Sequence, residues 1–140
     1  MKSFLTLLFL LISFSVFAGD DLTGKKIFCK KYAQYHEAVL IGFEFTSSDT
    51  VKYYASSTFK TKTYISSRAY QISTSKIYVM RGIGEQYKNE TDYEIDRRNL
   101  SINRLKLKHD FAEGECDVVN TDLITLIDFE LQVEKNTNLL

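Results

Sequence analysis

The chain has 140 residues and a formal net charge of zero, from 18 lysines and arginines against 18 aspartates and glutamates. This balance argues against a nucleic acid or an anionic membrane as the partner, because both attract proteins with a clear basic excess. The sequence contains no proline and no tryptophan but nine tyrosines and ten phenylalanines. Turns must therefore come from Gly, Asn, Asp and Ser, while the aromatic residues, together with many Thr, Val and Ile, favour strands.

The first residues have the pattern of a secretory signal peptide. Lys2 gives a positive start, residues 4–17 form an apolar run broken only by Thr and Ser, and Val16 and Ala18 are small residues at the recognition positions for cleavage. We expect cleavage after Ala18, which leaves residues 19–140 as a single secreted or periplasmic domain. The apolar run is shorter than the roughly 20 residues that span a bilayer. We therefore expect no stable membrane insertion after cleavage, with an uncleaved anchor as the alternative.

Two cysteines, Cys29 and Cys116, lie near opposite ends of the expected mature chain. In an oxidising compartment such a pair is most simply a disulfide. The alternatives are two free thiols, or a catalytic or metal-binding cysteine. A disulfide that closes so long a loop contributes about 4–5 kcal/mol of stability by the chain-entropy argument.

The first strand is expected at residues 23–32. The clearest pattern follows it, as an alternation of apolar and polar residues on both sides of a turn at 47–50. This alternation predicts a hairpin with one buried face. The residues on that face are Val39, Ile41, Phe43, Phe45, Val51, Tyr53 and Ala55.

The segment after this hairpin alternates less regularly. Tyr64 and Tyr70 share one phase, whereas Ile65 and Ala69 share the other. One extra residue in a strand exchanges its two faces, so we predict a β-bulge near residues 66–67.

A short apolar strand at 77–80 precedes a second hairpin. The strands of this hairpin pass through Tyr93 and Ile102, on either side of a polar turn at 96–99. After Asn103 the apolar phase shifts, which predicts a second bulge. The basic residues Arg104, Lys106 and Lys108 are expected to face water.

The last strand is expected at 115–119. The tail at 121–135 repeats Leu and Ile at helical spacing, which predicts a helix capped by Asn120 or Thr121. A strand is the alternative, because apolar residues such as Phe129 lie off the helical stripe.

Short strands at this spacing, separated by turn residues, are typical of an all-β sandwich or barrel. The sequence therefore predicts a mainly β fold, a small antiparallel β-barrel of about seven to eight strands with a C-terminal helix.

Two short elements carry a resemblance to a known family. The segment 22–27, LTGKKI, resembles the opening strand of lipocalin-like, calycin-type β-barrel proteins, with Lys26 at the position where the family has a tryptophan. Thr91-Asp92-Tyr93 matches the Thr-Asp-Tyr element of the same superfamily. Small secreted bacterial proteins of uncharacterised function have a similar layout, with one cysteine in the first strand and one late in the chain. The resemblance implies a secreted barrel followed by a helix.

Seven side chains are expected to point into this barrel, namely Phe43, Phe45, Tyr53, Tyr64, Ile77, Val79 and Tyr93. They predict either an apolar pocket in which tyrosine hydroxyls orient a ligand, or a core that the side chains fill themselves. The expected function is a secreted, non-enzymatic binding protein for a small apolar or amphipathic ligand. The alternative is an envelope or extracellular protein-interaction module with a filled core and no ligand.

Neither a metal site nor a cofactor site is expected. His36 and His109 are the only histidines, and the acidic residues beside them do not give the spacing of a zinc site. We interpret both as solvated loop residues. The basic residues of 97–108 and the lysines of 25–31 have two interpretations. They form either a patch for anionic polymers or, as we expect, solvated side chains that protect the faces and edges of the strands.

The sequence also lacks the recognised motifs of nucleophilic, metal-dependent and nucleotide-dependent catalysis. The carboxylates Glu113 and Glu115 flank a glycine in an expected loop. The protein is therefore not expected to be an enzyme.

Overall fold

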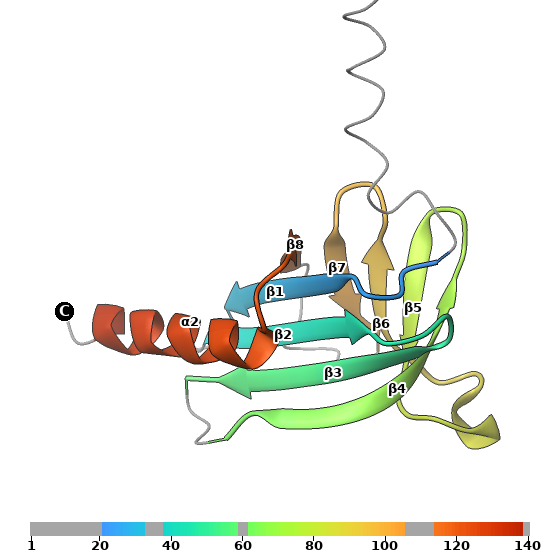
Figure 1. The fold of residues 1–140 in the computed structure, drawn as a ribbon, viewed down its shortest axis with the longest axis horizontal. Helices are drawn as coiled ribbons and strands as arrows, with labels where there is room; N and C mark the ends of the chain where they lie inside the picture. The colour runs from blue at the N-terminus through green and yellow to red at the C-terminus, as the bar shows by residue number, and fades with distance from the viewer. Residues whose placement is uncertain (1–20, 33–37, 59–61, 106–113, 139–140) are drawn as a thin grey trace, which may run out of the picture.

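The computed structural model describes residues 21–32, 38–58, 62–105 and 114–138. Within these residues, eight antiparallel strands follow one another around a closed barrel, and one long helix lies outside it (Figure 1). The predicted fold class is confirmed. The elements are β1 (Lys26–Tyr32), β2 (Ala38–Phe45), β3 (Thr50–Ser57), β4 (Tyr64–Ile72), β5 (Lys76–Met80), the short 3-10 helix η2 (Glu85–Tyr87), β6 (Thr91–Asp96), β7 (Ser101–Arg104), β8 (Gly114–Val119) and α2 (Leu123–Asn138).

The barrel closes at the seam between β1 and β8. Cys29 lies directly opposite Cys116 in this pairing, and the two residues form the predicted disulfide. The bond therefore joins the first strand to the last, across 87 positions of sequence. Among the described residues, the neighbouring strands β7 and β8 pair at two positions, Ser101 with Glu115 and Ile102 with Gly114.

The predicted first hairpin is formed by β2 and β3, whose pairing is uninterrupted. Its apolar face points into the barrel, as predicted, and cross-strand partners such as Phe43 and Tyr53 are both buried there. The buried residues of this interior core are Leu22, Ile27, Cys29, Ile41, Phe43, Phe45, Val51, Tyr53, Tyr70, Ile77, Val79, Tyr93, Ile95, Ile102 and Cys116.

A turn before β1 brings Leu22 into this core. Gly24 has a φ of +85°, a conformation that glycine adopts without strain. Its N–H donates a hydrogen bond to the carbonyl oxygen of Phe45 at 2.8 Å. Leu22 is fully buried and covers the end of the barrel where β1 begins and β2 ends.

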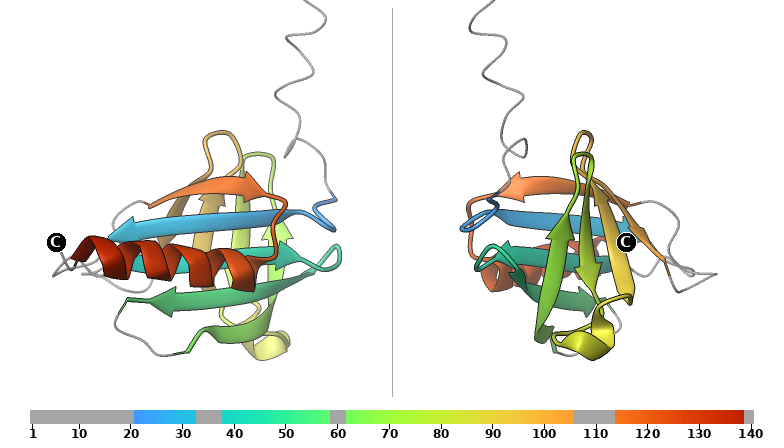
Figure 2. Two further views of the ribbon diagram at one scale, coloured as in Figure 1. Left: turned by 60° about the vertical axis from the view of Figure 1, so that its left-hand side comes forward. Right: turned by 90° about the vertical axis from the view of Figure 1, so that its right-hand side faces the viewer.

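Helix α2 lies against the outer surface of β1, β2 and β3 (Figure 2). Apolar residues on one face of the helix form a second core with outward-pointing side chains of these strands. Its buried members are Phe28, Leu40, Tyr54, Leu123, Ile127 and Leu131. The outer face of the first hairpin is therefore also buried where α2 covers it.

Gly42 allows α2 to approach this closely. It lies between Phe28 and Tyr54 in the strand register, directly under the helix. A Cβ atom at this position would lie 3.1 Å from Cδ1 of Leu123. A side chain here would therefore displace either the leucine or the whole helix.

The tail is a helix, as predicted, and not a strand. Its cap is Asp122, which corrects the prediction of Asn120 or Thr121, because the Asp122 carboxylate accepts a hydrogen bond from the backbone N–H of Thr125 at 3.1 Å. Among the described residues, no helix combines the length and the apolar character needed to cross a bilayer.

The predicted bulge near residues 66–67 is wrong. β3 and β4 pair without a register shift, which places Ser66 opposite Tyr53 and Arg68 opposite Val51. Ser66 and Arg68 thus occupy inward positions. The alternation in the sequence is hard to follow because the inward phase of β4 contains polar residues, and not because the strand is interrupted.

A bulge occurs in β6 instead. Val79 pairs with Tyr93, but Met80 pairs with Thr91, which leaves Asp92 as the extra residue. Asp92 and Tyr93 are both buried, as is expected where two neighbouring residues of a bulged strand face one partner.

Arg104 is a further correction. β6 and β7 pair without a shift, so Arg104 lies opposite Tyr93 on the inward phase, and the predicted second bulge is wrong for the described part of β7. Its guanidinium group bonds to Asp92 and does not simply face water. Lys106 and Lys108 lie outside the described residues.

Candidate functional site

Six of the seven predicted interior side chains are buried in the barrel, namely Phe43, Phe45, Tyr53, Ile77, Val79 and Tyr93. Tyr64 is a correction, because 55% of it is exposed. It lies opposite Ala55 at the first position of β4. It therefore has the inward phase but sits at the end of the barrel and not in its interior.

The buried rings pack against one another in the middle of the barrel. The ring of Phe43 lies 5.6 Å from the rings of both Tyr53 and Tyr93, and those two rings are 5.5 Å apart. Phe45 contacts Tyr70 edge to face at 4.9 Å. These are distances of direct ring packing. The rings therefore form a filled core at this level of the barrel.

A buried ion-pair cluster lies beside these rings. One oxygen of Asp92 accepts a hydrogen bond from Nη1 of Arg68 at 2.6 Å, and the other accepts one from Nε of Arg104 at 3.0 Å. Arg68 is 7% exposed and Asp92 is 4% exposed. Buried charges of this kind are tolerated only when they are paired, and here one carboxylate is shared by two guanidinium groups.

Two tyrosines join the ion pairs. The guanidinium of Arg68 lies 3.9 Å from the ring centroid of Tyr53, and that of Arg104 lies 5.1 Å from the ring centroid of Tyr93. The two tyrosine hydroxyls bond to each other at 2.7 Å. Burial raises the pKa of both phenols, and the neighbouring Tyr53 raises that of Tyr93 further. We name these five residues, Tyr53, Arg68, Asp92, Tyr93 and Arg104, the inner polar cluster.

Small side chains occupy the inward positions next to the inner polar cluster. Ala55 and Ser57 are the last inward residues of β3, Ser66 is an inward residue of β4, and Gly114 is the first inward residue of β8. We name these four residues the small-residue wall. These side chains are shorter than the aromatic rings that fill the middle of the barrel.

Three polar atoms in this region are buried without a hydrogen-bond partner among the described residues. They are Oγ of Ser57, Oγ of Ser66 and Nε of Arg68, and a fourth such atom, Oγ of Ser56, lies on the outward phase of β3. A buried polar group that remains unbonded costs about 1–3 kcal/mol. Arg68 therefore uses Nη1 for Asp92 and still presents a second donor.

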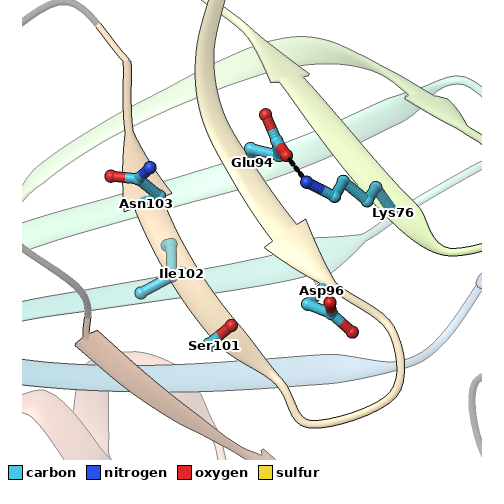
Figure 3. A pocket seen from close by; sticks show the side chains of 6 residues that line it. All are labelled: Lys76, Glu94, Asp96, Ser101, Ile102 and Asn103. Carbon is cyan, nitrogen blue, oxygen red and sulfur yellow. Dashed lines mark hydrogen bonds and ion pairs between the residues drawn. The ribbon is translucent and has the colours of Figure 1, made fainter.

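A separate hollow of about 160 Å³ lies on the outer surface of β5, β6 and β7 (Figure 3). It is lined by Lys76, Glu94, Asp96, Ser101, Ile102 and Asn103. Its charged groups are already engaged, because Lys76 pairs with Glu94 and Asp96 pairs with Arg98 at 3.1 Å. We therefore place the candidate site inside the barrel.

In the part of the chain that the structure describes, no three His, Cys, Asp or Glu side chains are grouped so that they could hold a metal ion. His36, His109 and Glu113 lie outside the described residues, and Glu115 is exposed on β8.

Some of the basic residues that were considered as a possible patch for anionic polymers make local contacts instead. Lys30 pairs with Glu134 and, at 3.4 Å, with Glu130, both on α2. Arg97 donates a hydrogen bond from Nη1 to the carbonyl oxygen of Ser73 at 2.7 Å. These basic side chains thus fasten elements of the fold to one another.

No family model, curated protein or solved structure matches the chain.

The alternation of apolar and polar residues in the sequence does not reveal the roles of Ser66, Arg68 and Asp92. A signal for the first two existed, because Tyr64 and Tyr70 share a phase that also contains both polar residues. Asp92 stands in the Thr-Asp-Tyr tripeptide, but only the bulge in β6 turns it inward.

Proposed function

We propose that this chain is a secreted or periplasmic, non-enzymatic binding protein that holds a small amphipathic ligand in the half of the barrel bounded by the small-residue wall. The observation that carries the proposal is the set of three buried polar atoms without a partner, on Ser57, Ser66 and Arg68. Buried polar groups of folded proteins bond to protein, to water or to a ligand. A ligand whose polar end reaches Ser66 and Arg68, two residues apart on the inward phase of β4, would satisfy the atoms of both.

The surroundings of these atoms suit an amphipathic molecule. The exposed ring of Tyr64, which packs against the buried ring of Tyr53 at 6.3 Å, supplies an aromatic surface at the end of the barrel. The inner polar cluster supplies fixed hydrogen-bonding groups at greater depth. Binding sites for small molecules commonly combine an apolar lining with a few such polar groups. The lipocalin-like resemblance of the sequence is in keeping with this proposal.

Native mass spectrometry of the protein purified from a secreting host, before and after extraction with organic solvent, tests this function. We expect an additional mass of a few hundred daltons that extraction removes. Ser66→Leu, which fills the small-residue wall, is expected to abolish the additional mass, whereas Ser67→Leu on the exposed face of the same strand should retain it. A bare mass for the wild-type protein, with ordered water as the partner of the three atoms, would overturn the proposal.

A second candidate function, protein interaction, is favoured by one surface of α2. Leu126, Phe129 and Val133 follow one another along one flank of the helix, and Phe129 is 63% exposed. Glu130 on the same flank bonds to Lys30, whose cross-strand neighbour on β8 is Glu115. The apolar flank therefore runs beside the outer face of β8.

That face of β8 carries Glu115 and Asp117, which are exposed and form no ion pair with other described residues. An apolar row beside two carboxylates fits a polypeptide segment with apolar and basic residues. A photoreactive amino acid at position 129 is expected to crosslink such a partner in the secreting host, while one at Asp128, which is exposed on the opposite flank of the helix, is not. Capture that persists in Glu115→Lys/Asp117→Lys would contradict this second function.

A further inference from the structure

The donors around the small-residue wall point to the chemistry of the ligand. Resting on the function proposed above, we infer that the polar end of the ligand is an oxyanion, such as a carboxylate, sulfonate or phosphate, held by Arg68 and Ser66.

The unpartnered atoms at the small-residue wall are hydrogen-bond donors. Nε of Arg68 is a donor and cannot accept a hydrogen bond, so the group that satisfies it must be an acceptor. The hydroxyls of Ser66 and Ser57 can also donate. Ser66 and Arg68 lie two residues apart on the inward phase of β4, and two donors there favour an acceptor with several lone pairs, which is the property of an oxyanion.

The charge and the burial of Arg68 also favour an anion as its partner. Arg68 is held in place by Asp92 and by the face of Tyr53, so its Nε is fixed before the ligand arrives. Hydrogen bonds from a guanidinium to an anion are about twice as strong as bonds between neutral groups. A fixed and buried guanidinium therefore discriminates between an anionic and a neutral polar end.

The positions of Ser66 and Arg68 along β4 bring both residues to Tyr53. Ser66 and Arg68 are two residues apart on the inward face, and Ser66 lies opposite Tyr53, on whose ring Arg68 stacks. Ser66 and the guanidinium of Arg68 are therefore both neighbours of Tyr53. An oxyanion can accept from both groups while its apolar part extends along the aromatic surface toward Tyr64.

Two fluorescent probes with the same aromatic skeleton test this inference, namely anilinonaphthalene sulfonate and neutral phenylnaphthylamine. Their dissociation constants are measured with the delipidated, disulfide-bonded protein. We expect the sulfonate to bind about tenfold or more tightly than the neutral probe, from one charge-assisted hydrogen bond. Arg68→Met is expected to remove this difference, and Arg81→Met, at an exposed arginine, is expected to retain it.

Ser66→Ala provides a second variant that leaves the ion pairs intact. We expect it to weaken sulfonate binding about tenfold, the value of one hydrogen bond to a charged group, with little change for the neutral probe. Circular dichroism identifies any variant that fails to fold.

The outcomes separate the inference from the proposed function. Equal affinity for the two probes in the wild-type protein would retain the binding function and overturn the oxyanion. Binding of neither probe would argue against the binding function itself. Loss of sulfonate binding in Phe129→Ser would place the probe on the outer flank of α2 and would also overturn the inference.

Discussion

Arg68 of β4 and Asp92 of β6 form an ion pair, 2.6 Å from Nη1 to Oδ2, inside a barrel whose neighbouring inward positions carry aromatic rings. The residues are 24 positions apart in sequence and belong to strands that are not adjacent in the barrel. The pair therefore connects two walls of the barrel across its interior.

Asp92→Asn is expected to destabilise the protein by about 3–5 kcal/mol, because removal of one partner leaves a buried guanidinium charge uncompensated. Urea unfolding followed by circular dichroism measures this loss. Glu94→Gln, which breaks the surface pair with Lys76, is the matched control and is expected to cause a much smaller change. Equal losses for the two variants would show that the buried Arg68–Asp92 pair stabilises the protein no more than the surface pair does.

Cys29→Ser is expected to lower the free energy of unfolding by about 2–5 kcal/mol, because the disulfide restricts the unfolded chain over a very long loop. The measurement compares denaturant midpoints of the oxidised wild-type protein and the variant. Cys29→Ser/Cys116→Ser should behave like the single variant, and reduced wild-type protein should approach both. Coincident midpoints under oxidising conditions would contradict a stabilising role for the bond.

Gly42→Val is expected to destabilise the protein by about 1–3 kcal/mol, because the added methyl groups would overlap Leu123 and overpack the core under α2. Valine has the higher strand propensity, so the sign of the effect depends on packing. In the Leu123→Ala background the same substitution should cost less, and a double-mutant cycle measures the difference. An equal cost in both backgrounds would place the strain somewhere other than the contact with the helix.

Hydrogen bonds from Arg98 lower the pKa of Asp96 to about 2, from an ordinary value of 3.8. A carboxyl group with a depressed pKa in the folded state stabilises that state above the ordinary pKa, and this contribution is lost as the pH falls toward 2. Titration of the Asp96 carboxyl carbon by NMR is expected to give a midpoint near 2, and Arg98→Ala should raise it. A native midpoint close to 3.8 would contradict these hydrogen bonds.

The sequence was sufficient to predict the hairpin of β2 and β3, because seven apolar residues alternate there in a single phase and all face the barrel interior or its edge. The disulfide could be predicted for an independent reason, since two cysteines in an oxidising compartment allow one pairing. Both predictions depend on properties of the residues themselves and not on distant partners.

Neither Arg68 nor Asp92 could be placed in the same way. A reading by hydrophobic alternation assigns polar residues to the solvent face, whereas these two are buried because they satisfy each other across the barrel. The helix was ambiguous for a related reason. Phe129 is apolar but exposed, so it weakens the stripe that Leu123, Ile127 and Leu131 would otherwise show.

The disulfide inside the barrel also acts on the helix outside it. Cys116 stands shortly before the start of α2, and its bond to β1 fixes β8 beside the same strands against which the helix packs. The short tether gives α2 a high effective concentration at its docking surface, so the helix loses little further freedom when it packs. Reduction of this one bond should therefore loosen α2 as well as the seam, and the two cores of the protein share a single covalent restraint.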